Sequence, residues 1–193
     1  MSNGKYEFVP GDEKVIAPGR TVKRIRALVA IAALGIVAGD TGGYVEAESN
    51  LQVYGDAWVS GNAQVYGDAW VYGNAWVYGD ARVYGDARVY GDAQVYGNAQ
   101  VYGNARVSGN AWVYGDARVA SHRAICWFTG VGTDHATLTA CYDKDGEVLL
   151  TRGCFCGSID EFIARSEARH DEPTQHEYRL LIEVAISRLE RSK

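Results

Sequence analysis

A six-residue word is repeated eleven times without a break between residues 53 and 118. Each copy reads Val, then Tyr or Ser, Gly, Asp or Asn, Ala, and one variable residue. A fixed short period predicts a solenoid, because one short unit cannot bury its apolar face alone and must stack on its neighbours. The repeat therefore predicts one elongated architecture for about a third of the chain.

Each letter of the word suits one place in a coiled chain. Val is always first and Ala is always fifth, and we expect both to point inward, since Val favours a short strand and Ala fits a tight corner. Gly and Asp or Asn, the third and fourth letters, tolerate the backbone of a bend. The word resembles the hexapeptide repeat of the left-handed parallel β-helix, in which three words form a coil of eighteen residues. This resemblance implies just under four coils, stacked about 4.8 Å apart.

Eighteen-residue coils place every third word in one column, which gives the outside three faces. The face that carries no charge and is richest in aromatic residues is centred on Val59, Val77, Val95 and Val113. Its aromatic members are Trp58, Trp76, Tyr78, Tyr96, Trp112 and Tyr114. Monomeric proteins seldom expose a broad apolar patch, so this face is a predicted contact surface for a second copy or a partner.

Another face is centred on Val53, Val71, Val89 and Val107. It places Arg88 and Arg106 one coil apart beside Tyr90. Two stacked guanidinium groups can clamp an acidic or phosphate-bearing partner. They can also serve only to keep the tyrosine columns soluble, and both interpretations stay open.

Asp and Asn alternate down the columns of bends. One column reads Asp56, Asn74, Asp92 and Asn110, and the next reads Asn62, Asp80, Asn98 and Asp116. Amide ladders stabilise stacked strands, and like charges placed opposite one another destabilise them. We therefore interpret the alternation as structural, with cation binding between stacked carboxylates as the alternative. Only Asp68 over Asp86 breaks the pattern.

The segments on either side of the repeat lack its period. Residues 1–46 are predicted to form a β cap over the first coil, whose edge must be covered, and residues 47–120 form the coils. Residues 27–38 are small or apolar and follow basic residues, as in a signal peptide. They begin too late for such a signal and are too short to span a bilayer, so we predict buried strands there.

Residues 121–193 are predicted to form a small α+β unit. A strand at 125–128 precedes a hairpin whose turn is Asp143-Lys144-Asp145-Gly146. Ser158 and Glu161 form a capping box that opens a helix ending near His170. A second helix is expected from about Gln175, after Pro173.

The ends of the chain also resemble a known family. The motifs RIRAL at 24–28 and AGDTGGYVE at 38–46 resemble the entry segment of bacterial and prophage hexapeptide-repeat proteins of the acetyltransferase-like or polymer-forming type. The motifs ICWF at 125–128, TRGCF at 151–155 and EYR at 177–179 resemble a tail found in phage-encoded members. The resemblance implies a phage or prophage origin and a β-helix fold, and it carries no settled activity. The apolar stretch 27–38 departs from the more polar relatives.

The sequence offers little for an acyltransferase. Such hexapeptide-repeat enzymes use a His as general base near a loop extruded from the coils, but here the coils contain neither a His nor such a loop. All four histidines follow the repeat, namely His122, His135, His170 and His176. The pair Asp134-His135 is the one candidate for a base with its orienting carboxylate. We expect no enzymatic activity, with solvated surface as the preferred interpretation of this pair.

The four cysteines are Cys126, Cys141, Cys154 and Cys156. Cys154 and Cys156 with His122 or His135 raise the possibility of zinc, but paired two-residue-gap knuckles are absent. We expect reduced thiols, no metal and no cofactor. A disulfide is not expected without an export signal.

Charge and residue types limit the partners. The formal net charge of −5 gives no footprint for direct nucleic-acid binding. Nothing in the composition indicates a membrane, and we expect a protein of the bacterial cytoplasm. Exposed Trp, Tyr and Arg are the residue types enriched at interface hot spots.

The sequence therefore predicts a non-catalytic phage-type binding protein. We expect a homo-oligomer formed through the Trp-rich face or the C-terminal helices, with a trimer favoured because parallel β-helices of this kind commonly pack as trimers. It would bind or occlude a host macromolecule, such as a protein of a bacterial defence system, for example a CRISPR effector. A structural component of a phage particle and an acyltransferase are the alternatives.

Overall fold

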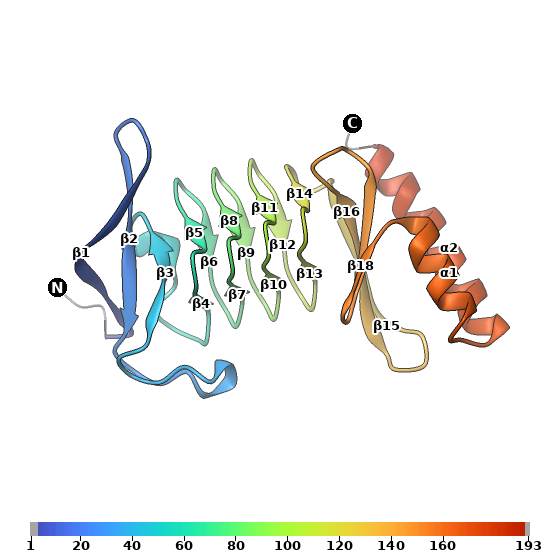
Figure 1. Ribbon diagram of the computed structural model, residues 1–193, viewed down its shortest axis with the longest axis horizontal. Helices are drawn as coiled ribbons and strands as arrows, with labels where there is room; N and C mark the ends of the chain where they lie inside the picture. Colours follow the sequence, from blue (N-terminus) through green and yellow to red (C-terminus); the bar gives the residue numbers. More distant parts are fainter. Residues whose placement is uncertain (1–3, 192–193) are drawn as a thin grey trace.

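The computed structural model describes residues 4–191 and has three parts arranged along one axis (Figure 1). A small sheet lies at the N-terminal end, parallel coils lie in the middle, and a sheet with two helices lies at the C-terminal end. One sheet runs through all three parts in the order β1-β2-β3-β5-β8-β11-β14-β16-β17-β18, with β15 paired to β16. The mainly β architecture predicted from the repeat is confirmed.

The coils form a parallel β-helix with very short strands. Each strand holds the last letter of one word and the Val of the next. The first column contains β4 (Trp58–Val59), β7 (Trp76–Val77), β10 (Gln94–Val95) and β13 (Trp112–Val113). The second contains β6 (Trp70–Val71), β9 (Arg88–Val89) and β12 (Arg106–Val107). The third contains β5 (Gln64–Val65), β8 (Arg82–Val83), β11 (Gln100–Val101) and β14 (Arg118–Val119). Partners such as Val77 and Val95 are eighteen residues apart, as predicted.

The core of the coils consists almost entirely of the Val and Ala letters. The Val letters from Val59 to Val119 are fully buried, as are nearly all the Ala letters. Val53 is an exception that the repeat does not predict, because it is only half-buried and Leu51 instead bridges to Val71. Leu51 and Val59 are eight residues apart rather than six, so two extra residues enter the first turn. Leu51 buries more apolar surface at the coil end than Val53 would.

The bends are held by backbone geometry and by side-chain ladders. The eleven repeat glycines have φ between 58° and 77°, a region that Gly enters without steric cost. A Cβ on Gly91 would lie 2.9 Å from the nitrogen of Gly109 in the next coil. The Asn amides donate to Asp carboxylates one coil away, in the pairs Asn62–Asp80 (3.2 Å), Asn74–Asp92 (3.0 Å) and Asn98–Asp116 (3.1 Å). These bonds confirm the structural interpretation of the Asp and Asn alternation.

The N-terminal cap contains β1 (Tyr6–Ala17), β2 (Arg20–Ala27) and β3 (Thr41–Val45). β3 runs antiparallel to β2 and parallel to β5, which joins the cap to the coils. A short 3-10 helix, η2 (Glu48–Asn50), leads into the first coil. The sequence boundaries at 46/47 and 120/121 fall just after β3 and β14.

The prediction of buried strands across 27–38 is wrong. Past Ala27 the segment contains the 3-10 helix η1 (Ala32–Leu34) and a bridge between Ile31 and Ile36. Ile31 is buried, whereas Val29 and Val37 are 46% and 58% exposed. Its apolar residues do not alternate at the period of a strand, and Gly35 ends the 3-10 turn in a left-handed conformation.

Lys5 completes the hydrogen bonding of the first coil. In the coils many backbone N–H groups donate to a carbonyl of the following coil, as Trp58 donates to Ala75, so the carbonyls at the start of the first coil need donors from outside the repeat. The Lys5 ammonium donates to the carbonyls of Gln52 (3.1 Å), Gly55 (2.9 Å) and Ala57 (2.7 Å). Burial lowers the pKa of Lys5 to about 8, and the charge of Asp56 opposes this shift. One side chain thus replaces part of a missing coil.

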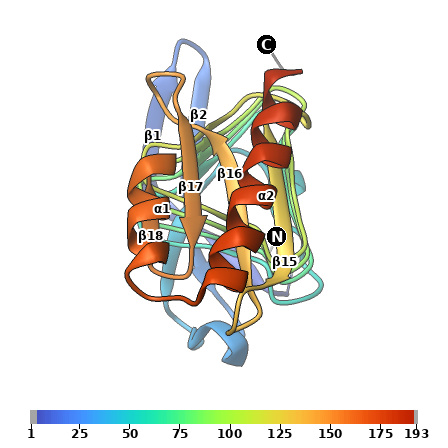
Figure 2. The ribbon, with the colours of Figure 1, turned by 90° about the vertical axis from the view of Figure 1, so that its right-hand side faces the viewer.

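The C-terminal unit contains β15 (Ile125–Val131), β16 (Ala136–Tyr142), β17 (Val148–Arg152), β18 (Phe155–Gly157), α1 (Ile159–Glu167) and α2 (Glu172–Glu190). Both helices lie across one face of its sheet (Figure 2). The predicted strand, hairpin and two helices are present, and β18 is an addition. α1 ends at Glu167 rather than near His170. α2 starts earlier than predicted because Pro173 sits in its first turn, where a missing N–H costs nothing.

The C-terminal sheet closes the last coil. β16 pairs antiparallel with β14. The Trp112 N–H donates to the Thr139 hydroxyl (3.2 Å), and the Thr151 hydroxyl donates to the Trp112 carbonyl (2.6 Å). Among residues 4–191, no helix has the length and apolar character needed to cross a membrane.

Candidate functional site

The aromatic face on β4, β7, β10 and β13 is covered at both ends. Trp58 was predicted to lie on the surface, but it is fully buried and packs edge-on against Tyr6, with ring centroids 6.4 Å apart. The cap covers it, which the repeat could not indicate because Tyr6 lies outside the word. At the other end Tyr114 is buried, and its hydroxyl donates to the carbonyls of Gly153 and Phe155. Neither residue is placed to contact a partner.

The middle of this face holds Trp76, Tyr78, Tyr96 and Trp112, which are all half-buried. Tyr78 stacks on Tyr96 with centroids 4.6 Å apart, and the Trp76 indole donates to the Ser60 hydroxyl (2.9 Å). Burial raises the pKa of Tyr96 to about 12. These rings contact one another and leave only part of their surface to solvent.

Tyrosine ladders run along all three faces. Tyr66, Tyr84 and Tyr102 stack with centroids 5.0 and 5.2 Å apart, and Tyr72 stacks on Tyr90 at 4.8 Å. The stacked rings are nearly parallel, with interplanar angles of 3°, 7° and 4°. The second letter of the word therefore builds a continuous outer layer over the core.

The face of β6, β9 and β12 is the most open. Trp70, Arg88 and Arg106 lie in register in successive coils, and all three are exposed. Within residues 4–191, no carboxylate forms an ion pair with Arg88 or Arg106. Trp70 stacks on Tyr72 at 4.2 Å. The arrangement presents two uncompensated guanidinium groups beside aromatic rings.

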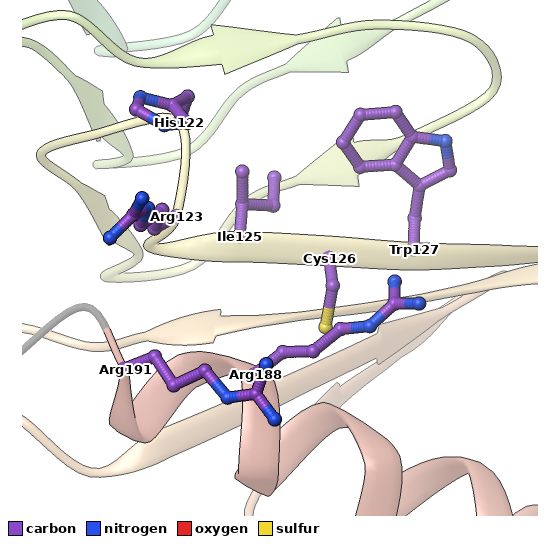
Figure 3. Close-up of a pocket in the computed structure, with 7 residues that line it drawn as sticks. All are labelled: His122, Arg123, Ile125, Cys126, Trp127, Arg188 and Arg191. Atoms are coloured by element: carbon purple, nitrogen blue, oxygen red, sulfur yellow. The ribbon is translucent and has the colours of Figure 1, made fainter.

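A basic cleft of about 540 Å³ lies between β15 and α2 (Figure 3). It is lined by His122, Arg123, Ile125, Cys126, Trp127, Arg188 and Arg191. Among residues 4–191, no acidic side chain lines it, although the full sequence carries a net charge of −5. Ile125 and Trp127 project from one side of β15, and Cys126 projects from the other side toward Arg188 (Figure 3). The cleft combines three guanidinium groups with apolar side chains of β15.

Trp127 links the basic cleft to the end of the coils. Trp127 follows Gly109 by eighteen residues, and a Cβ on Gly109 would lie 3.3 Å from the Trp127 indole nitrogen. Trp127 therefore lies at the Gly109 bend, which joins β12 to β13 at the end of the coils. Because Trp127 also lines the cleft, the cleft begins near the bend that follows Arg106. We name the residues Trp70, Arg88, Arg106, Arg123, Arg188 and Arg191 the basic stripe.

Trp70, Arg88 and Arg106 could be placed on one face from the sequence, whereas Arg123, Arg188 and Arg191 could not. Arg123 and Arg188 are far apart in the sequence and come together only through the packing of α2 on β15. The spacing of Gly109 and Trp127 was the one available signal, since it continues the eighteen-residue period beyond the last word.

Asp134 and His135 do not form a base with its orienting carboxylate. The Asp134 carboxylate accepts a hydrogen bond from Arg152 instead. Burial opposes ionisation of this carboxyl, but the hydrogen bond and charge of Arg152 outweigh it and lower the pKa of Asp134. His135 is exposed and has a φ of 50°, a turn conformation. The pair therefore lacks the contact that general-base chemistry would require.

The four cysteines are free thiols. Cys126 and Cys141 are buried, and Cys154 and Cys156 are exposed. Burial raises the pKa of Cys126 to about 11, although Arg188 opposes the shift. Within residues 4–191, no group of three or more His, Cys, Asp or Glu side chains is placed to hold a metal ion.

One comparison with known proteins concerns the coils. A family model described as the YdcK beta solenoid repeat matches residues 51–67, 63–79, 81–97 and 99–115. These stretches cover about a third of the chain. No curated protein is significantly similar to the chain. The match and the coils together confirm a repeat β-helix protein, whereas the phage origin and the phage-type tail stay predictions.

Proposed function

We propose that this chain is a non-catalytic binding protein that holds an acidic macromolecular partner along the basic stripe. The observation that carries the proposal is the column of Arg88 and Arg106, exposed, in register and without carboxylate partners among the described residues. The resemblance to phage-encoded proteins makes a host protein the partner to test first, with occlusion as the mode of action. An acidic surface of a bacterial defence protein has the required chemistry.

The geometry favours an extended contact. Arg88 and Arg106 are one coil apart, about 4.8 Å, and guanidinium groups bind carboxylates through two parallel hydrogen bonds. Trp70 adds a rigid apolar contact at one end, and Trp127 adds one in the cleft at the other. Rigid coils hold these side chains at fixed spacing, which lowers the entropy lost on binding.

The test is a quantitative capture of host proteins by the purified chain. The double variant Arg88→Ser and Arg106→Ser should lose the specific partner and reduce the salt dependence of capture. Arg82→Ser is the matched control, because Arg82 is also an exposed last letter but lies on β8, on another face. A partner that the double variant retains, or that Arg82→Ser loses equally, would contradict the proposal.

The two alternative functions, a phage-particle component and an acyltransferase, predict different experimental results. A structural component of a phage particle would appear in purified virions. An acyltransferase would turn over acyl-CoA and lose that activity with His135→Ala.

We also propose self-association, through α2 rather than the aromatic face. Trp58 and Tyr114 are buried within one chain, which removes both ends of the face first expected to form the trimer contact. On α2, Leu180 and Val184 are 48% and 42% exposed and lie one turn apart. Light scattering at micromolar concentration should give the mass of an oligomer. Leu180→Lys with Val184→Lys should reduce it to 21.0 kDa, whereas a wild-type monomer would exclude self-association.

A further inference from the structure

A second pocket, separate from the basic cleft, lies where the turn between β17 and β18 meets α1 and α2. Its volume is about 230 Å³, and it shares no lining residue with the cleft. Three arginines line it, namely Arg152, Arg165 and Arg169, with Asp134 as the only acidic side chain. The pocket is therefore rich in hydrogen-bond donors and positively charged.

Buried polar groups without partners gather at this pocket. Among the described residues, four buried side-chain nitrogen or oxygen atoms have no hydrogen-bond partner. Three of them belong to lining residues: Nε of Arg152, Oγ of Ser166 and the hydroxyl of Tyr178. Ser166 and Tyr178 are only 6% and 1% exposed. Buried polar groups are almost always paired, so three unpaired atoms in residues that line one pocket call for a bound partner.

Arg152 shows which partner is missing. Its Nη2 donates to the Val131 carbonyl (3.0 Å) and to the Asp134 carboxylate, so both of its acceptors lie at one end of the guanidinium. Nε can only donate, and Asp134 already serves Nη2. The atom that completes Arg152 must be an acceptor. The Ser166 hydroxyl can donate as well, so one group with several oxygens would satisfy both Arg152 and Ser166.

Phe155 and Phe162 give the wall an apolar part. Phe155 and Phe162 pack edge to face with centroids 5.2 Å apart, and Arg165 lies 5.7 Å from the Phe155 centroid. An anion alone would leave these rings without contact. A phosphate offers more acceptor oxygens than a carboxylate and matches the three arginines better.

We propose that this pocket binds a small organic phosphate, with the phosphate oxygens held by Arg152, Arg165, Arg169 and the Ser166 hydroxyl and the carbon part against Phe155 and Phe162. The site is independent of the basic stripe. It gives the protein a small-molecule ligand in addition to a macromolecular partner.

Phenyl phosphate and inorganic phosphate are the probes, titrated by isothermal calorimetry against the whole chain. Phenyl phosphate should bind more tightly than inorganic phosphate, because only it contacts the two Phe rings. Arg169→Gln should weaken phenyl phosphate at least tenfold. Arg188→Gln removes the same charge from the basic cleft and should leave the affinity unchanged.

Ser166→Ala separates ligand binding from folding. Loss of an unpaired buried hydroxyl should leave the melting temperature of the free protein unchanged or higher, while phenyl phosphate binds more weakly. If neither phenyl phosphate nor inorganic phosphate binds at millimolar concentration, the proposal is wrong. It is also wrong if Arg169→Gln and Arg188→Gln weaken the binding of phenyl phosphate equally. Equal affinity for the two probes would overturn the assignment of the apolar wall.

Discussion

The coils and the C-terminal unit satisfy their polar groups in different ways. In the coils, a bond such as that from Asn62 to Asp80 is formed between equivalent positions one coil apart, and the repeat reproduces it. In the C-terminal unit each polar contact is made once, and Arg152, Ser166 and Tyr178 each keep an unpaired buried atom. Repetition stabilises the fold, and it leaves fewer buried polar atoms without a hydrogen-bond partner than the unique sequence does. The unique sequence is therefore where ligand sites are to be expected.

The largest expected effect comes from comparing one position of the repeat where unique sequence covers it and where it does not. Trp58 and Trp76 occupy the same letter and pair in register, but Trp58 is fully buried under the cap and Trp76 is half-buried. Trp58→Ala should lower the free energy of unfolding by about 3–5 kcal/mol, as for other large core residues. Trp76→Ala should cost clearly less. If urea denaturation shows that both variants lose similar free energy of unfolding, the burial of Trp58 under the cap does not add to stability.

The inward corner gives the next largest effect. Ala87 is fully buried in the core of the coils. Ala87→Leu should overpack this corner and lower the free energy of unfolding by about 1–3 kcal/mol. Ala164 is exposed on α1, and Ala164→Leu there should change stability by less than about 0.5 kcal/mol. A thermal melt of Ala87→Leu that matches the wild type would refute the eighteen-residue register.

The period of the word was sufficient to predict the coils, because every copy imposes the same inward Val and Ala. It was insufficient where a unique segment meets the repeat. Leu51 displaces Val53 at the first coil, and Tyr6 covers Trp58, and both depend on contacts with non-repeating sequence. Residues 27–38 were misassigned because apolar composition does not distinguish a strand from an irregular loop without a clear period.

The candidate sites follow the same division. Arg88 and Arg106 could be placed on one face from the sequence, since both lie within the words. Arg123 and Arg188 could not, because only the packing of α2 against β15 brings them to one cleft. The unpaired atoms of Arg152 and Tyr178 are likewise a property of tertiary packing.

The tyrosine ladders predict sensitivity to alkaline pH. Burial, followed by the neighbouring Tyr78, raises the pKa of Tyr96 from its usual value near 10 to about 12. The unfolded chain therefore loses this proton first, and stability that is present below pH 10 is lost as the pH rises toward 12. Because the ring is partly exposed, the linked loss of stability is about 1 kcal/mol.

Absorbance at 295 nm and circular dichroism, followed together from pH 9 to 12.5, measure this effect. Tyr96→Phe should unfold at higher pH than the wild type, because it removes one of the groups whose ionisation opposes folding. An unchanged midpoint would show that ionisation of Tyr96 is not linked to unfolding.

The smallest effect concerns the one interruption in the Asp and Asn alternation. β5 and β8 pair in register, which places Asp68 one coil from Asp86, and both are exposed. Asp68→Asn should remove the repulsion and allow the amide to donate to Asp86, as Asn62 donates to Asp80. The expected gain is about 0.2–1 kcal/mol. Asn62→Asp places a carboxylate over Asp80 and should cost a similar amount. Because both changes act through exposed charges, 1 M salt should reduce their difference in chemical denaturation. If the ladders stabilise the coils, the two variants must change the free energy of unfolding in opposite directions at low salt. If neither variant changes it, the alternation has no energetic role.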